Sequence, residues 1–474
     1  MLSGTLVLIG GKKNGNGDER LLAYEECLER VRYVCRYLLL LQVGDYLQGV
    51  GEESLSGLLG RCFGEDTAAL EIGALGGTYR YAANPLLVRG FDDSKRPTWV
   101  KGYKLRSVGG LKFTRQRAKR IALISHVMAR NGAPLALMSA AKILKEAGYE
   151  LDVYTVVSGA LVNDFKALGI PVVIDPIVHG MPFPDQPWYH DYDLIIANTA
   201  VLIGCFRKQL TDTPVLWWLH ESASILEWSG VNAECFSKVK MEGVKALAVS
   251  EVTIRDIHAL APELPINSTL TLGIKDEFKG REKKEDKSPF VFMMCGSWEE
   301  RKGQDIFLKA IGMLSEEERR KCEFLLVGGK GTVTTPDYSK EVESLSAALP
   351  EVKLVERIPH EEVLALYEKV DAVVVPSREE SLSMVAIEAL MMGRPCIVSD
   401  NVGVAADVRE GGAGLIFSSG EVDELADKMR ILMSDTNLAE NMGKSGRMAY
   451  KSKFTSEKFA EKILMEVEAF LKDE

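Results

Sequence analysis

The stretch from Asp371 to Ser399 constrains the fold of this chain more than any other, because it contains a strand, a loop, a helix and a second strand in close succession. Its first residues, Asp371–Val375, form a β-branched apolar run that is typical of a strand buried in a parallel sheet. Pro376 ends that strand, because proline has no N–H group to donate to a neighbouring strand. The helix ends near Gly393 and Pro395, and another apolar run follows. A strand–helix–strand unit of this kind predicts an α/β fold built on parallel sheets.

Two acids in this stretch are candidate ligand-binding residues. Glu380 lies just past the carboxyl end of the strand, and Glu388 lies inside the helix. Ligands of open α/β sheets bind at this edge, where the unpaired amides of residues 381–385 can bind a phosphate group. The carboxylates can accept hydrogen bonds from sugar hydroxyls, so the spacing indicates two sugars joined by a diphosphate. An ordinary βα unit with acids on its surface is the alternative, and the spacing alone leaves it open.

The residues around the two acids resemble the signature of a known enzyme family. The pattern VVPS-x-x-E-S-L-S-M-V-x-x-E-A-L-x-x-G-x-P is similar to that of the family 4 (group 1) retaining glycosyltransferases. That family often has glycine where Ser381 and Ser383 stand, and serine is small enough to let a diphosphate approach. The resemblance implies the GT-B fold, in which two Rossmann-like domains face a cleft.

The resemblance also assigns roles to charged residues. Lys302 matches the lysine that neutralises the diphosphate of the donor, whereas Ser297 stands where the family has an arginine. Arg301 is adjacent and could replace that charge. Glu380 would hold hydroxyls of the donor sugar and support an oxocarbenium-like state, and Glu388 would hold the ribose.

Further positions complete the site that the resemblance implies. His220 follows the expected strand at 215–219, and the resemblance implies that it orients the donor sugar. The glycine-containing turn at 131–133 resembles a loop beside the sugar, although a simple tight turn explains it equally well. The remaining expected donor-binding residues are Gly132, Gly296, Ile358, Ser381, Leu382, Ser383, Met384 and Val385.

Alternation of strand and helix patterns divides the chain into five expected parts. They are an N-terminal, partly helical extension of unknown role at 1–118, an acceptor-side Rossmann-like domain at 119–275, a polar linker at 276–289, a nucleotide-sugar-binding Rossmann-like domain at 290–455 and a C-terminal helix at 456–474 that crosses back to the N-terminal domain. The last strand before the linker is expected at Thr269–Gly273.

Charge and cysteine content narrow the partners. A net charge of −10 argues against a general nucleic-acid binder. The eight cysteines are scattered without metal-ligand spacing, which suggests buried thiols in a reducing cytoplasm. No apolar stretch is long enough to predict a transmembrane helix.

One basic segment, from Lys95 to Arg120, contains no acid and departs from the acidic character of the chain. It suits peripheral contact with anionic lipid at the inner face of a membrane, or a phosphorylated acceptor. We favour a solvated segment that pairs with acids or another subunit, because aromatic residues and glycine are interleaved without a clear amphipathic helix.

These observations predict a glycosyltransferase. The expected reaction moves a sugar from a nucleotide-diphosphate sugar to a hydroxyl acceptor with retention of configuration, in bacterial surface glycan or glycoconjugate synthesis. We expect neither a metal nor a cofactor, and the turn at 131–133 lacks the G-x-G-x-x-G fingerprint of dinucleotide enzymes. Two alternatives stay open. One is a non-catalytic GT-B scaffold, suggested by Ser297 and the unexplained extension; the other is a GT-B epimerase or phosphorylase.

Overall fold

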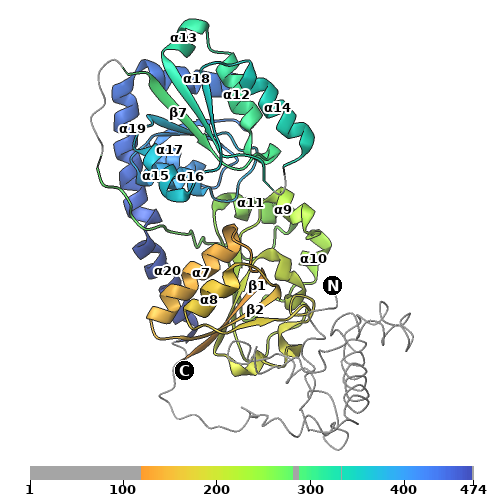
Figure 1. Ribbon diagram of the computed structural model, residues 1–474. Helices are drawn as coiled ribbons and strands as arrows, with labels where there is room; N and C mark the ends of the chain where they lie inside the picture. Colours follow the sequence, from red (N-terminus) through yellow and green to blue (C-terminus); the bar gives the residue numbers. More distant parts are fainter. Residues whose placement is uncertain (1–118, 281–287, 332–333, 472–474) are drawn as a thin grey trace, which may run out of the picture. The chain divides into compact units, whose positions relative to one another are not determined.

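The computed structural model describes residues 119–280, 288–331 and 334–471 of the chain (Figure 1). The predicted extension at 1–118 lies outside these ranges, as does the basic segment apart from its last two residues. Contacts between Cα atoms divide the chain into two compact units. The described parts of the first are 119–218, 231–246 and 466–471, and the second comprises 219–230 and 247–465 with its two gaps.

The first sheet has six parallel strands in the order β3-β2-β1-β4-β5-β6. Its strands are β1 (Arg120–Val127), β2 (Glu150–Val157), β3 (Val172–Ile174), β4 (Leu194–Asn198), β5 (Val215–Leu219) and β6 (Val244–Ala248). Helices α7 (Gly132–Glu146) and α8 (Leu161–Ala167) pack against each other beside it. Pro134 suits the first turn of α7, and Gly148, at φ 91°, allows the chain to leave that helix.

The second sheet has the order β12-β11-β10-β7-β8-β9, so its strands repeat the arrangement of the first. Its strands are β7 (Phe290–Cys295), β8 (Cys322–Val327), β9 (Val352–Val355), β10 (Ala372–Val375), β11 (Cys396–Ser399) and β12 (Gly414–Phe417). Its helices are α12 (Gln304–Gly312), α13 (Glu316–Arg320), α14 (Pro336–Ala347), α15 (His360–Tyr367), α16 (Met384–Met391), α17 (Ala405–Glu410), α18 (Val422–Ser434) and α19 (Thr436–Ala449). Two parallel sheets of six strands confirm the predicted pair of Rossmann-like folds.

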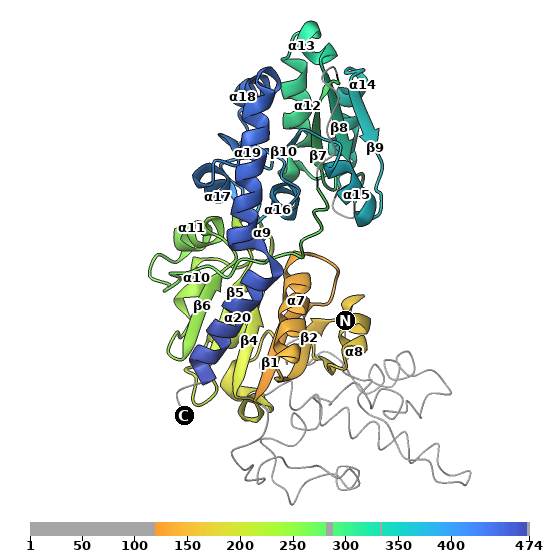
Figure 2. The ribbon, with the colours of Figure 1, turned by 90° about the vertical axis from the view of Figure 1, so that its left-hand side faces the viewer.

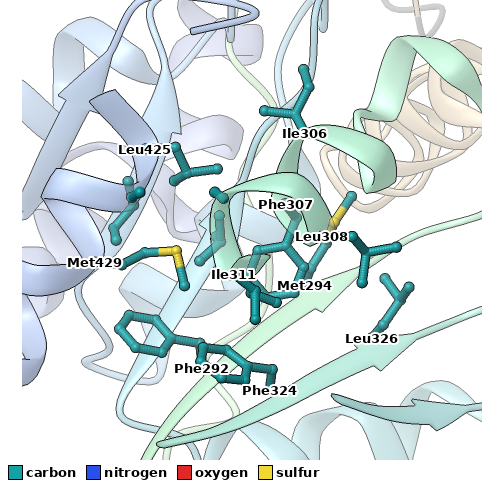
Figure 3. Close-up of a cluster of buried hydrophobic side chains, with 14 of the residues drawn as sticks. Phe292, Met294, Ile306, Phe307, Leu308, Ile311, Phe324, Leu326, Leu425 and Met429 are labelled. Atoms are coloured by element: carbon teal, nitrogen blue, oxygen red, sulfur yellow. The ribbon is translucent and has the colours of Figure 1, made fainter. Parts of the chain in front are cut away.

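The core of the second unit lies under α12, which packs between α14 and α18 (Figure 2). Alternate residues of β7, among them Phe292 and Met294, point to the same face of the sheet and meet Phe307 of α12 (Figure 3). The side chains of Phe292 and Phe324 stack with ring centroids 5.8 Å apart. This packing fixes the start of α12, and therefore the loop that joins β7 to α12.

The predicted strand at Thr269–Gly273 is wrong. The segment makes one bridge to β6, between Thr269 and Ala248, and no ladder follows. The reason is that β6 ends at Ala248 and the chain turns into helix α11 (Glu251–Leu260), whose N-terminus is capped by the Ser250 side chain. No β6 backbone remains to pair with residues after 270.

The C-terminal helix α20 (Ser456–Leu471) begins in the second unit and ends in the first. Its Glu466 carboxylate forms an ion pair with Lys245, which also belongs to the first unit. Across the parts of the chain that the structure describes, every helix is too short or too polar to cross a lipid bilayer.

Candidate functional site

The candidate site lies at the carboxyl edge of the second sheet, where the loops after β7 and β10 meet. Gly303 makes this approach possible: it adopts φ 75°, and a Cβ atom there would lie 2.1 Å from the Pro376 carbonyl oxygen. The Arg378 amide donates a hydrogen bond to the Arg301 carbonyl oxygen, 2.7 Å away. Because β7 and β10 are neighbours in the sheet, residues far apart in sequence converge here.

Lys302 and Glu380 form an ion pair across these two loops. Lys302 Nζ lies 2.5 Å from Glu380 Oε1, and the two side chains are 17% and 13% exposed. The Ser377 hydroxyl donates to the other carboxylate oxygen, Oε2, at 3.0 Å. Burial alone would raise the pKa of Glu380, but Lys302, Arg301 and the Ser377 hydrogen bond together hold it below its ordinary value. The carboxylate is therefore ionised at neutral pH and available to accept hydrogen bonds.

The loop that carries Glu380 is fixed to the loop after β11. The Glu380 amide donates to the Asn401 carbonyl oxygen at 3.1 Å, and the Gly403 amide donates to the Glu380 carbonyl oxygen at 2.8 Å. A Cβ atom at Gly403 would lie 2.0 Å from the Ser381 carbonyl oxygen, so only glycine permits this contact. The position of the Glu380 backbone is thus set by two strands of the sheet.

Helix α16 begins at Met384, inside the segment 381–385 whose amides are predicted to bind a phosphate. Ser383 is its N-cap and has φ 89°, a left-handed conformation that costs a residue other than glycine about 1–3 kcal/mol. The Ser383 hydroxyl accepts a hydrogen bond from the Ala386 amide at 3.3 Å. Of the predicted amide donors, Ser381 and Leu382 therefore precede the helix, and only Met384 and Val385 belong to its first turn.

Glu388 is held by two residues of α15 that the sequence analysis missed. The Tyr367 hydroxyl donates to Glu388 Oε2 at 3.0 Å, and His360 Nε2 lies 2.7 Å from Oε1. The hydrogen bond to Glu388 raises the pKa of His360 above its ordinary value. The spacing of seven residues between His360 and Tyr367, which places them on one helix face, was the available signal.

Cys295 is the last residue of β7, at the same edge of the sheet. Burial and the charge of Glu388, opposed by the charge of Lys302, raise the pKa of its thiol to about 11. Lys302 lies in the loop after β7, Glu380 in the loop after the neighbouring strand β10, and Glu388 in the helix that follows that loop, so the structure brings the three residues to one edge of the sheet.

Position 297, where the family resemblance leads us to expect an arginine, carries a serine, and the neighbouring Arg301 is paired with an acid. The Ser297 hydroxyl donates to Glu299 Oε1, and Arg301 Nε lies 2.7 Å from Glu299 Oε2. Gly296 has φ 155°, and its carbonyl oxygen would lie 2.1 Å from a Cβ atom at Gly328. Glu299 was not predicted as a site residue, and no spacing rule would have indicated it.

The other predicted residues lie in different places. Ile358 is half-buried between β9 and α15. His220 follows β5 and groups with the second unit, and its amide donates to the Glu221 carboxylate at 2.9 Å. Gly132 opens α7 in the first unit and has φ outside the left-handed region, with no atom within 4 Å of an added Cβ. Its local geometry therefore gives no steric reason for glycine.

The carboxyl edge of the first sheet carries a second polar group of residues. Thr199 follows β4 with φ 110°, and its hydroxyl lies 3.1 Å from His126 Nδ1. The side-chain amide of Asn198 donates a hydrogen bond from Nδ2 to the Ala133 carbonyl oxygen at 3.0 Å. Burial, and to a smaller extent His179, lowers the pKa of His126. No residue pattern predicts this group, because threonine is not expected at a positive φ angle.

Two family models match this chain, one over each sheet. Residues 117–254 match "Glycosyl-transferase family 4", and residues 275–449 match "Glycosyl transferases group 1". A D-inositol 3-phosphate glycosyltransferase of Corynebacterium diphtheriae is 27% identical over 175 residues. That alignment covers 36% of this chain and 41% of the relative, so the chain spans less than half of the relative's length.

Solved structures share the fold. HepE from Anabaena, in complex with UDP and glucose, superposes with a TM-score of 0.58 at 19% identity, over 73% of this chain and 99% of HepE. A glycosyltransferase from Rickettsia africae superposes with a TM-score of 0.59 at 16% identity, over 75% of this chain and all of that one. At these identities the likeness concerns the fold. In the described residues, no three His, Cys, Asp or Glu side chains gather as they would around a metal ion.

Proposed function

The chain belongs to the family 4 (group 1) glycosyltransferases, and from that premise we propose that it transfers a sugar from a nucleotide-diphosphate sugar to a hydroxyl acceptor. The observation that carries the proposal is the Lys302–Glu380 ion pair at the carboxyl edge of the second sheet, with Glu388 in the helix that follows the Glu380 loop. These groups can bind an anion and two sets of hydroxyls within one site.

Lys302 has the central role in this proposal. The leaving group of the reaction is a nucleoside diphosphate, so the transition state gains negative charge on phosphate oxygens. Lys302 is 17% exposed, and the ion pair with Glu380 holds its side chain in place. A lysine fixed before the donor arrives stabilises the developing charge without rearrangement.

The two acids would recognise the sugars at either end of the diphosphate. Glu380 is ionised and would accept hydrogen bonds from the donor sugar and support positive charge at its anomeric carbon. Glu388 would accept hydrogen bonds from the ribose, beside a nucleobase near Ile358. Tyr367 and His360 hold the Glu388 carboxylate in place for this role.

The remaining features of the proposal follow the family resemblance. The proposal includes retention of configuration, orientation of the sugar by His220 and a role for Gly132. It also includes a place in bacterial surface glycan or glycoconjugate synthesis. We also propose that no metal or cofactor takes part, because Lys302 and Arg301 can supply the positive charge at the diphosphate. UDP is the first nucleotide to test, because the structure of HepE holds UDP and glucose.

The decisive experiment measures turnover of nucleotide sugars. A panel of UDP-, GDP- and ADP-sugars is screened by thermal shift, since a ligand at a hundred times its Kd adds about 2.7 kcal/mol of stability. The best donor is then assayed for transfer and hydrolysis. Lys302→Ala and Glu380→Gln should each lower kcat by about 100-fold or more. Lys353→Ala, a change at an exposed lysine of the same unit, is the control.

The alternatives give different results. Donor binding without turnover for any acceptor would favour a non-catalytic scaffold. An epimerase would change the sugar without an acceptor, and a phosphorylase would show the absorbance of pyridoxal phosphate. Equal activity in the wild type and in Lys302→Ala would overturn the proposed site.

A further inference from the structure

Glu299 is a nearly buried acid in the loop between β7 and α12, and each of its carboxylate oxygens has a partner. The Ser297 hydroxyl donates to Oε1, and Arg301 Nε forms an ion pair with Oε2 at 2.7 Å. The Glu299 side chain is 14% exposed. We call Ser297, Glu299 and Arg301 the Glu299 cluster. It occupies the place where the family resemblance leads one to expect a single arginine.

The guanidinium of Arg301 is only partly used by this cluster. Its Nε atom pairs with Glu299, and its two terminal nitrogens donate to no other residue that the structure describes. The side chain is 38% exposed. A guanidinium presents its donors as a planar fork, so the free terminal edge can still bind a phosphate in a bidentate manner.

Arg301 directly precedes Lys302, the lysine of the Lys302–Glu380 ion pair. The positive charge of Arg301 is one of the influences that lower the pKa of Glu380, so the guanidinium lies within electrostatic reach of that carboxylate. An anion that contacts Lys302 would therefore also lie within reach of Arg301. The two cations follow each other in the short 3₁₀ turn Glu300–Lys302.

The backbone of the loop is fixed independently of the Glu299 cluster. The Glu300 carbonyl oxygen accepts a hydrogen bond from Arg378 Nη1 at 2.6 Å, and the Ser297 carbonyl oxygen accepts one from Gln304 at 2.8 Å. The Trp298 amide donates to the Gly329 carbonyl oxygen at 2.9 Å. These hydrogen bonds use main-chain groups of the loop, whereas the Glu299 carboxylate contacts the side chains of Ser297 and Arg301.

We propose that Glu299 is a positioning residue that holds Arg301 with its free edge directed at the donor diphosphate, so that the Arg301 guanidinium takes the place of the arginine missing at position 297. The inference rests on the proposed function. Its physical reason is entropic: immobilising an arginine side chain on binding costs conformational entropy, and the ion pair with Glu299 removes part of that cost beforehand. Ser297 takes part by fixing the second oxygen of Glu299.

The test measures Kd by calorimetry on the full chain for UDP, UMP and uridine, or for the corresponding GDP or ADP series if that nucleotide binds more tightly. Arg301→Ala should weaken diphosphate binding by about tenfold and leave nucleoside binding within about twofold. Glu299→Gln should weaken diphosphate binding by about threefold in the wild type and have no further effect in Arg301→Ala. This loss of additivity, limited to the diphosphate, is not expected of a residue with a merely structural role.

A rescue experiment sharpens the test. Ser297→Arg, introduced into Arg301→Ala, places a guanidinium at the position of the family arginine and should restore diphosphate binding at least in part. Where Glu299→Gln does not fold, Arg301→Lys replaces it. That variant keeps the charge but loses the fork, and it should weaken diphosphate binding by a few-fold.

Tighter diphosphate binding by Glu299→Gln would overturn the inference, because Glu299 would then compete with the ligand for Arg301. Equal effects of Glu299→Gln with and without Arg301 would also overturn it. Lys302→Ala separates this failure from that of the proposed function. If Lys302→Ala weakens diphosphate binding and Arg301→Ala does not, only the inference fails. If neither variant weakens diphosphate binding, the proposed function fails.

Discussion

The two sheets have the same strand order, but the side chains at their carboxyl edges differ in charge. At the first edge, the described polar side chains include His126, whose pKa is lowered, together with an amide and a threonine hydroxyl. At the second edge, Lys302 and Arg301 pair with Glu380 and Glu299. The shared topology sets where a ligand can bind, whereas the residues after each strand decide which ligand it is.

Ion pairs at the second edge also differ among themselves. Each carboxylate oxygen of Asp305 accepts two hydrogen bonds. Arg378 donates to both oxygens, Lys309 donates to Oδ2, and the Tyr338 hydroxyl donates to Oδ1. Lys302 has one described partner, Glu380, and Arg301 has a free edge. A saturated charge network supports the fold, whereas charges with remaining hydrogen-bonding capacity are available to a ligand.

Removing the saturated acid should produce the largest effect. Asp305→Asn leaves Arg378 without its charge partner, and we expect a loss of about 2 kcal/mol in the free energy of unfolding, because Asp305 is buried and its pKa is lowered from 3.8 to about 2. Although burial opposes ionisation, Arg378 and Lys309 lower the pKa of Asp305 to about 2. Its contribution is therefore complete above the unfolded pKa of 3.8 and is lost as the pH falls through 2.

Urea denaturation of the two proteins measures this loss, with Asp337→Asn at a fully exposed acid as the control. A change below about 0.5 kcal/mol would show that the second edge does not depend on its charges, and the contrast with the first edge would fail.

Glu388 tests the ligand side of the comparison. Glu388→Gln replaces a charged acceptor with a neutral amide, so affinity for UDP should fall by about tenfold. The wild type should prefer UDP to 2′-deoxy-UDP, and the variant should lose most of that preference. Calorimetry with both nucleotides, and Glu362→Gln as an exposed control on α15, gives the answer. An unchanged preference would remove Glu388 from the ribose site.

Thr199 tests whether the first edge stores strain. At φ 110° glycine is favoured over residues with a Cβ atom, so Thr199→Gly should be more stable than Thr199→Ala by about 1 kcal/mol. Both variants lose the hydroxyl that contacts His126, so the difference isolates the backbone. Thermal unfolding of the pair measures it, and the ordinary order, with alanine more stable, would contradict the strain.

The smallest effect concerns pH, and the two edges should respond in opposite directions. The pKa of His126 is lowered by burial and His179, so stability should fall as the pH drops from 6.5 through the folded pKa. The pKa of His360 is raised by Glu388, although burial opposes this, with smaller contributions from Glu361 and Glu277. Its contribution is present below pH 6.5 and is lost as the pH rises through its folded pKa.

NMR titration of the two imidazoles measures these pKa values directly, with His126→Gln and His360→Gln as assignment controls. Should both rings titrate near 6.5, the electrostatic contrast between the edges would be absent.

Local patterns were sufficient to predict much of this molecule. The β-branched run before Pro376 and the cap at Gly393 predicted a strand–helix–strand unit, and the structure has β10, α16 and β11 there. The strand at Thr269–Gly273 failed because its composition suits a strand, but the neighbouring chain turns into α11 and offers no partner. Strand pairing depends on both of the segments that would pair, whereas the residue pattern of one segment describes that segment alone.

The contacts of the candidate site were beyond local patterns for the same reason. His360 reaches Glu388 because the loop after β9 approaches α16, and Arg301 meets Glu299 through the shape of a single turn. The conformations of Thr199 and Ser383 could not be read from residue type, since both residues avoid positive φ angles elsewhere. Which side chains meet across two loops depends on which strands are neighbours in the sheet, and a single sequence does not show the order of the strands.

The contact between Gly403 and the Ser381 carbonyl oxygen has a consequence for protein engineering. An isolated β-bridge between residues 380 and 402 joins the two loops, so chimeras with related sequences should exchange positions 380–403 as a single block. A crossover inside that block would combine halves shaped for different neighbours. Libraries that diversify 381–383 should likewise keep glycine at 403, because any larger residue there would displace the very backbone being selected.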